Sequence, residues 1–135
     1  INVFGEEVMI HNAEQALKTA CEKTKTHMID YTVAPIFMDG NSGAHQWLIE
    51  FESDPEHLDY FTKILDDHLK AINSDYEAKR FNNYILQLPT ITVLPKGTFY
   101  NWLKSNQKLG GQFKVPRLNN TRQVVDEILQ SIKNN

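Results

Sequence analysis

The sequence contains one cysteine, Cys21, and no long apolar run. A single cysteine excludes a disulfide within the chain and is typical of a reducing compartment, so we expect a cytoplasmic protein. No stretch approaches the roughly 20 apolar residues that a membrane-spanning helix requires, and no signal peptide is visible at the start. The absence of these features predicts that the protein has no membrane partner.

An excess of positive charge is also missing. Lysine and arginine together number 14 against 17 acidic residues, which gives a net charge of −3. The basic residues are scattered, whereas domains that bind nucleic acid usually carry a basic patch. We therefore expect no nucleic-acid partner.

The sequence lacks the signatures of most self-contained catalytic and metal sites. Its glycines do not have the spacing of a phosphate-binding loop, and no HExxH, CxxC or nucleophile-elbow pattern occurs. His57 and His68 share a predicted helix face, but a helix separates them by ~16 Å, too far for one metal ion. We expect no metal site. Cys21 lies on an apolar helix face, where a small core residue is the simplest interpretation.

The chain has 135 residues, of which 41% are apolar and 23% charged, as expected for one globular domain spanning residues 1–135. It begins with Ile1 rather than methionine, so we expect a fragment of a larger protein. No later stretch has the composition of a linker. The segment Gly5, Glu6 and Glu7, just before the first helix, is therefore the predicted hinge to a preceding domain.

Alternating polar and apolar residues predict a β-hairpin. Residues Met28–Met38 and Ala44–Glu52 form the two strands, and the turn cluster 39–43 makes them antiparallel. Thr90–Leu94 predicts a third strand, and Ile1–Phe4 a short fourth one. Together with the helices, this order indicates an α+β fold, with a small, mainly antiparallel sheet of three to four strands flanked by helices.

Apolar stripes at helical spacing, each with a capping residue, predict the helices. The expected first caps are Asn12, with Gln15 in a capping box; Asp54, followed by Pro55 and Glu56; Thr98; and Asn120, with Gln123. A shorter helix is expected over Asp75–Arg80, and Gly110 and Gly111 are expected to end the helix that Thr98 begins. Trp47 and Trp102 fall on apolar stripes and are predicted core residues, whereas Asp66 and Asp67 are predicted to face solvent.

Residues 110–117 differ from the rest of the chain. Pro116 favours an extended conformation at Val115, and side chains alternate along extended backbone. Phe113 and Val115 are then expected to face the core, while Gln112 and Lys114 face outward. A lysine ammonium held in this way suits the oxygens of a phosphate group. From the residues alone, an ordinary surface lysine in a connecting loop is the alternative.

Several short motifs carry a resemblance to a known family. They are the run Lys96-Gly97-Thr98-Phe99, the run Gln112-Phe113-Lys114-Val115-Pro116-Arg117, the strand motif Asp30-Tyr31-Thr32, and the spacing of Asn73, Tyr76 and Arg80. These motifs resemble the C-terminal end of the auxin-responsive acyl-acid amido synthetases of the Gretchen Hagen type, which join amino acids to plant hormones and benzoates and have bacterial relatives. Phe113 replaces the tyrosine usual in the plant members. The chain is identified as a bacterial-like member.

The resemblance implies the C-terminal lid domain of an adenylate-forming ligase. Such an enzyme uses ATP with Mg²⁺ to adenylate a small carboxylic acid and then transfers the acyl group to an amine or amino acid. The partner of the lid is the enzyme's own N-terminal domain, which binds the nucleotide and the acid and would be missing here. Lys114 matches the lysine that contacts phosphate during adenylation, and Gln112 and Arg117 are the other nucleotide-binding candidates.

The resemblance also bears on what the domain can do by itself. The lid alone is expected to be inactive and to bind no cofactor, because one lysine is not a complete site. The plant members carry a lysine near the domain joint, where this chain has Glu6 and Glu7. A free-standing α+β module that binds or senses a small molecule, without catalysis, stays open as the alternative function. The acyl acid, the acceptor and the oligomeric state are not encoded in any of these motifs.

Overall fold

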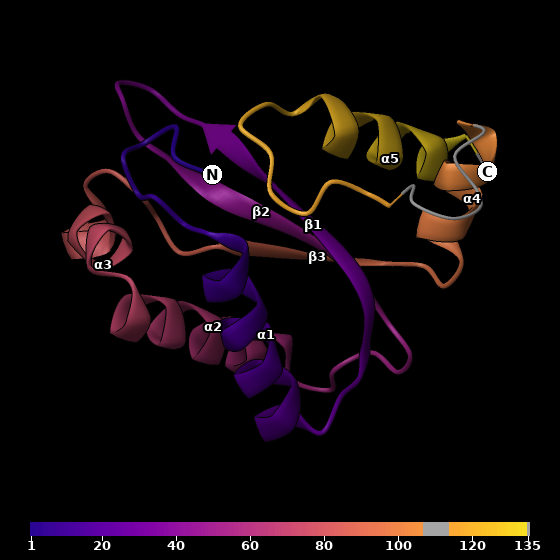
Figure 1. Ribbon diagram of the computed structural model, residues 1–135, viewed down its shortest axis with the longest axis horizontal. Coiled ribbons are helices and arrows are strands. Elements are labelled where there is room, and N and C mark those ends of the chain that lie inside the picture. Colours follow the sequence, from indigo (N-terminus) through magenta and orange to yellow (C-terminus); the bar gives the residue numbers. More distant parts are fainter. Residues whose placement is uncertain (107–113, 135) are drawn as a thin grey trace.

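A central sheet lies between two layers of helices (Figure 1). The computed structural model describes residues 1–106 and 114–134. The described elements follow the chain in this order: α1 (Ile10–Thr24), β1 (Met28–Phe37), β2 (Gly43–Phe51), α2 (Leu58–Ile72), α3 (Ser74–Arg80), the 3₁₀ turn η1 (Phe81–Asn83), β3 (Thr90–Leu94), α4 (Thr98–Ser105) and α5 (Gln123–Lys133). The predicted α+β class is confirmed.

Within the described residues, the sheet has three strands in the order β1-β2-β3. β1 and β2 form the predicted antiparallel hairpin, in which Tyr31 lies opposite Ile49. β3 instead pairs parallel with β2, because the chain returns from the end of β2 through α2 and α3. The predicted short strand Ile1–Phe4 is wrong: the chain turns there, and the Gly5 amide donates to the Asn2 carbonyl.

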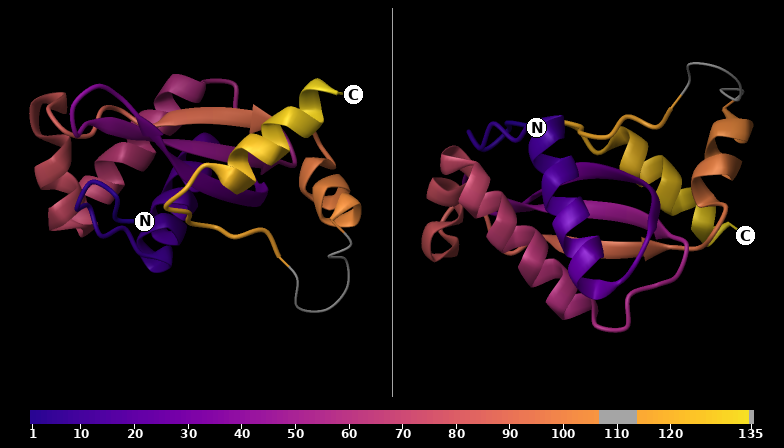
Figure 2. Two further views of the ribbon diagram at one scale, coloured as in Figure 1. Left: turned by 90° about the horizontal axis from the view of Figure 1, so that it is seen from above. Right: turned by 60° about the horizontal axis from the view of Figure 1, so that its bottom comes forward.

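The two faces of the sheet carry separate cores. One face, with Tyr31, Val33, Trp47 and Ile49, packs against α1 and α2, which Figure 2 (right) shows crossing in front of the sheet. The other face packs against α4 and α5, and its core consists of Ala34, Leu48, Leu94, Phe99, Trp102, Val115, Val125 and Ile128. The predicted core positions of both tryptophans are confirmed, since their exposed fractions are 0% and 5%. No helix in residues 1–106 and 114–134 has the length and apolar character needed to cross a membrane.

Three predicted helix caps, Asn12, Asn120 and Asp54, are wrong. Asn12 lies inside α1, where its Oδ1 accepts hydrogen bonds from the Met9 amide and from the side chain of Asn73. Asn120 lies outside α5, and its Oδ1 accepts from the Asn2 amide. α2 begins only at Leu58, the first residue of the stripe that buries Phe61, so Asp54 is not its cap.

The end predicted for the fourth helix also differs. α4 ends at Ser105, with Asn106 as its C-cap. Gly110 and Gly111, which we expected to end this helix, lie outside the described residues. At the start of α4, Thr98 is the first helical residue rather than the cap, and its hydroxyl donates to the Pro95 carbonyl.

The prediction that Asp66 and Asp67 both face solvent is wrong for Asp66. Asp66 is 2% exposed, and its carboxylate accepts hydrogen bonds from both Arg80 nitrogens Nε and Nη2 at 2.8 Å and from the Tyr76 hydroxyl at 2.6 Å. Arg80 also donates to the carbonyl of Leu86. A buried carboxylate needs such partners to offset its lost hydration. The network therefore ties α2 to α3 and to the loop that leads into β3.

Candidate functional site

Lys114 faces solvent, and the residue that follows it is buried in the core. Lys114 is exposed, whereas the next residue, Val115, is 2% exposed and belongs to the core between the sheet and α4 and α5. This confirms the predicted alternation for these two residues. Gln112 and Phe113, the other residues of the predicted alternation, lie outside the described residues.

Backbone hydrogen bonds fix the chain directly after Lys114 to β1. The Val33 amide donates to the Arg117 carbonyl at 2.8 Å, and the Asn119 amide donates to the Val33 carbonyl at 3.0 Å. The Thr32 hydroxyl donates to the Pro116 carbonyl at 2.6 Å. Residues 116–119 thus lie beside β1, on the edge away from β2, before the chain turns into α5 (Figure 1).

Arg117 is held by acidic groups at the edge of the sheet. Its Nη2 lies 3.7 Å from Oδ1 of Asp30, and its Nε lies 3.9 Å from Oε1 of Glu14. The guanidinium also lies 5.8 Å from the centre of the Tyr31 ring, within the range of a cation–π contact. Lys114 and Arg117 are the two basic residues of the predicted site. The Arg117 side chain is restrained by these protein groups.

Lys114 lies in the field of the same acidic cluster. Burial raises the pKa of Asp30, while its backbone hydrogen bond from Tyr31 and the charges of Arg117 and Lys114 counteract the rise. Among residues 1–106 and 114–134, no hydrogen bond or ion pair engages the Lys114 ammonium. An exposed ammonium on an anchored backbone can approach an anionic oxygen of a second molecule or domain with little rearrangement.

Glu50 positions the helix that precedes this segment. Glu50 is 3% exposed, and its carboxylate accepts hydrogen bonds from the amides of Gly97 and Phe99 at 2.9 and 3.0 Å. These amides open α4, where a carboxylate also meets the positive end of the helix dipole. The sequence analysis missed this role. The available signal was an acid within the otherwise apolar run Trp47-Leu48-Ile49-Glu50-Phe51, because a buried acid in a strand requires donors.

The predicted hinge contains a buried contact between Glu6 and His45 that sequence reasoning also missed. Glu6 is fully buried; its Oε2 lies 2.6 Å from Nε2 of His45, and its Oε1 accepts from the Phe4 amide. Burial acts to raise the pKa of Glu6, but the hydrogen bond with His45 and the backbone hydrogen bonds together outweigh it and hold the pKa below its ordinary value. Gly5 and Glu7 on either side have positive φ angles of 84° and 46°. The pair fixes Glu6 to β2, and the hinge itself stays a prediction.

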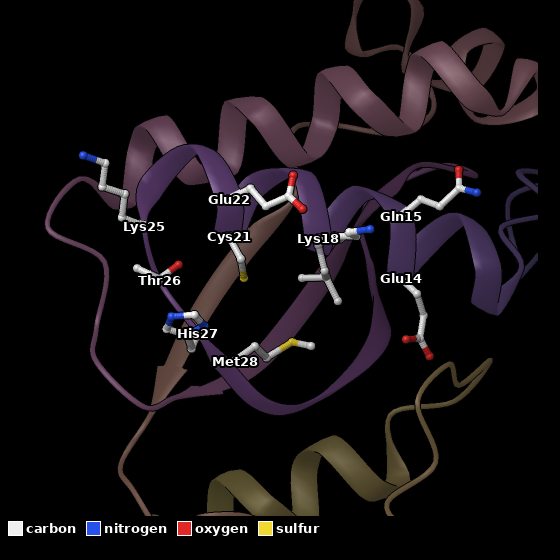
Figure 3. A pocket seen from close by; sticks show the side chains of 10 residues that line it. Glu14, Gln15, Lys18, Cys21, Glu22, Lys25, Thr26, His27 and Met28 are labelled. Atoms are coloured by element: carbon white, nitrogen blue, oxygen red, sulfur yellow. The ribbon is translucent and has the colours of Figure 1, made fainter.

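A groove lies along α1 and the start of β1, and Glu14, the partner of Arg117, lines one end of it (Figure 3). It encloses about 800 Å³, and Figure 3 shows Cys21 and Met28 in its middle, with Glu14 and Lys25 toward its ends. Cys21 is half-buried and packs against the core below it, and burial raises the pKa of its thiol. A raised thiol pKa disfavours the nucleophilic thiolate. Within the described residues, no three His, Cys, Asp or Glu side chains lie where they could hold a metal ion.

Comparisons with known proteins agree with the motifs. The chain aligns with a solved structure of "GH3.15 acyl acid amido synthetase" with a TM-score of 0.74 and 17% identity, over 97% of this chain and 24% of that one. A structure of "AtGH3.15 acyl acid amido synthetase in complex with 2,4-DB" aligns with a TM-score of 0.66 and 18% identity, over 89% of this chain and 23% of that one. The chain thus spans about a quarter of the length of these relatives.

Sequence comparison identifies the family through a domain model rather than through a single curated relative. Among curated proteins, none matches this chain significantly. A family model described as the GH3 family C-terminal domain matches residues 11–123, which include β1, α4, Lys114 and Arg117. Because this match covers most of the chain, the protein belongs to the GH3 family, of which the chain represents the C-terminal domain.

Proposed function

We propose that this chain is the C-terminal domain of an ATP-dependent acyl-acid amido synthetase, a ligase that adenylates a carboxylic acid and transfers the acyl group to an amine or amino acid. Membership of the family and the names of the similar structures support this proposal. The observation that carries it is the placement of Lys114, an exposed ammonium whose neighbour Val115 is buried and whose following backbone is bonded to β1.

Lys114 is the catalytic residue of the proposal. When a carboxylate oxygen attacks the α-phosphorus of ATP and pyrophosphate leaves, negative charge builds on the phosphoryl oxygens. An ammonium placed against those oxygens stabilises the transition state more than the ground state. Mg²⁺, bound with ATP, supplies further charge neutralisation on the phosphates. The chemistry of the donor fits: an exposed primary ammonium on rigid backbone is a suitable ligand for phosphate oxygen.

Arg117 and Gln112 have lesser roles in the proposal. The ion pairs of Arg117 with Glu14 and Asp30 support a positioning role, in which Arg117 holds the segment that carries Lys114 rather than leaving it to contact phosphate. Gln112 is proposed to contact the nucleotide on the strength of the family motif alone.

The proposal also includes a rotation between the two half-reactions. Torsions at Gly5 and Glu7 would let the domain present Lys114 during adenylation and withdraw it before the amine attacks. This rotation requires the contacts that hold Ile1, Asn2 and Glu6 to the domain in this structure to open. The remaining partners are the preceding domain, a small acid and an amine, and the proposed compartment is the cytoplasm.

The test is carried out on the full-length gene product. Labelled pyrophosphate should exchange into ATP when a carboxylic acid from a panel of aromatic and aliphatic acids is added, and the rate should depend on that acid. A search for the amide product with a panel of amino acids follows. The chain of residues 1–135 by itself should give no exchange. Binding of ATP without acid-dependent exchange for every acid tested would contradict the proposal.

A further inference from the structure

One end of the molecule exposes apolar side chains from three parts of the chain. Figures 1 and 2 place the β1–β2 hairpin, the N-terminal segment and the α3–η1 region at the same end, opposite α4. We call the surface there the apolar end face and define it by Val3, Phe4, Phe37, Met38, Phe81 and Tyr84. Phe37, Phe81 and Tyr84 are 59%, 66% and 73% exposed.

Part of the apolar end face is a groove, and the rest is an aromatic pair whose Tyr84 directly precedes the groove residue Ile85. Val3, Phe4, Phe37 and Met38 line one groove of about 340 Å³ together with Ile85, and this groove has no ionisable side chain in its lining. The rings of Phe4 and Phe37 lie 5.9 Å apart, and Phe81 and Tyr84 form an edge contact at 6.3 Å. Aromatic residues and methionine without charge at the centre are typical of protein interfaces.

The start of the chain forms part of this surface. The Ile1 amine donates to the Val8 carbonyl, and the Asn2 amide donates to Asn120, so both residues are fixed to the body of the domain. Val3 and Phe4 then line the groove itself. The residue directly before Ile1 is therefore only three or four residues, or roughly 10–14 Å of extended chain, from the groove. Attachment at such short range gives the preceding part of the chain a high effective concentration at this surface.

We infer that the apolar end face is the docking surface for the part of the protein that precedes Ile1. The inference rests on the proposed function, in which this chain is the C-terminal domain of a longer enzyme, and the chain spans about a quarter of its relatives' length. The face lies at the opposite end from α4, the helix that leads toward Lys114. Docking at this end leaves the exposed Lys114 outside the interface.

The experiment is site-specific photo-crosslinking in the full-length protein. The photoreactive residue p-benzoyl-L-phenylalanine replaces Phe37 in one variant and Tyr100 in a control. Tyr100 is matched to Phe37 in exposure, at 58%, but lies in α4 at the other end. After irradiation and digestion, mass spectrometry should find crosslinks from position 37 to residues that precede Ile1 at a yield at least fivefold that of position 100. Crosslinks mainly to a second copy, or equal yields at both positions, would overturn the inference.

A second measurement does not depend on the efficiency of the crosslinking reaction. Phe37→Ser in the full-length protein should speed protease cleavage near Ile1 several-fold, because the interface loosens, while Tyr100→Ser should leave it unchanged. Equal cleavage rates in both variants would count against the docking surface. Both readouts need no activity, so they are independent of the pyrophosphate exchange that tests the proposed function. A crosslink from position 37 without acid-dependent pyrophosphate exchange would support the docking surface and contradict the proposed ligase function.

Discussion

At the scale of single residues, buried acids organise this domain. Asp66, Glu50 and Glu6 are at most 3% exposed, and each has at least one hydrogen-bond partner in another segment of the chain. Their partners lie in α3, at the start of α4 and in β2. Because a buried carboxylate is stable only with such donors, each acid specifies how two elements meet.

The first prediction concerns Asp66. Asp66→Asn removes the charge that balances Arg80 in a nearly closed site, so the free energy of unfolding should fall by about 3–5 kcal/mol. Asp67→Asn is the control, since its side chain is 51% exposed and its ion pairs lie at the surface; it should change stability by less than about 1 kcal/mol. Urea denaturation of residues 1–135 measures both. Equal losses would show that the Asp66 network has no special role.

The same variant should change the acid sensitivity of the fold. Burial acts to raise the pKa of Asp66, but the hydrogen bonds from Arg80 and Tyr76 outweigh it and lower the pKa. A lowered pKa means that Asp66 stabilises the fold above about pH 4, the ordinary value in the unfolded chain, and that this contribution is lost as the pH falls further. Below pH 4 the stability of Asp66→Asn should therefore fall less steeply than that of the wild type. Glu6 titrates in the same direction, so some slope should remain.

At the scale of elements, Glu50 connects β2 to α4. Glu50→Ala leaves the amides of Gly97 and Phe99 without their acceptor at a buried helix start, and should lower stability by about 2–3 kcal/mol. Glu52→Ala, two residues further on and exposed, should change it by less than about 0.5 kcal/mol. In the full-length enzyme, Glu50→Ala should also slow adenylation, because α4 leads toward the Lys114 segment. A stability loss shared by both variants would contradict the assigned cap.

Gly43 allows the β1–β2 hairpin to close over the N-terminal segment. A Cβ at this position would lie 2.0 Å from the Ile36 carbonyl oxygen and 2.5 Å from Cζ of Phe4. The backbone oxygen cannot move without breaking the strand register, so Gly43→Ala should destabilise by more than about 2 kcal/mol. At Gly40, which has a φ of 73° and open space around it, alanine meets only backbone strain, about 1–2 kcal/mol. Thermal melts that rank Gly40→Ala as the worse change would refute this account.

The elements that the sequence predicted well are those whose signal is local. Thr90–Leu94 has the predicted bounds, and the hairpin strands differ from prediction by only one residue at some ends. The predictions for Asn12 and Asn120 were wrong because an amide side chain can bind distant groups, here the Asn73 side chain and the Asn2 amide, and local sequence does not show this. Asp66 misled for a similar reason, since its partner Arg80 lies 14 residues away.

The candidate site could be predicted only in part. Lys114 and Val115 alternate as extended backbone requires, and the family motif singled out the lysine. The ion pairs of Arg117 with Asp30 and Glu14 arise from the pairing of residues 116–119 with β1, which no local pattern encodes. The Glu6–His45 pair likewise joins residues 39 positions apart.

At the scale of the whole molecule, the two surfaces with proposed roles lie in different parts of the domain. The apolar end face lies near the N-terminus, and the segment that carries Lys114 is anchored to β1 and leads into α5. The Glu6–His45 pair attaches the N-terminal segment to the sheet between them. A rigid body with an attachment surface at one end and an exposed ammonium elsewhere is suited to act as a rotating lid.

The effect of Lys114→Ala on the two half-reactions of the full-length enzyme tests the central claim most directly. Acid-dependent pyrophosphate exchange should slow ~10²–10³-fold, or about 3–4 kcal/mol, because the lost contact forms in the transition state. Amide formation from a supplied acyl adenylate, ATP affinity and the melting temperature should change little, and Lys104→Ala, an exposed lysine in α4, should change none of them. If Lys114→Ala slows both half-reactions equally or lowers the melting temperature, Lys114 is a structural residue and the account is contradicted.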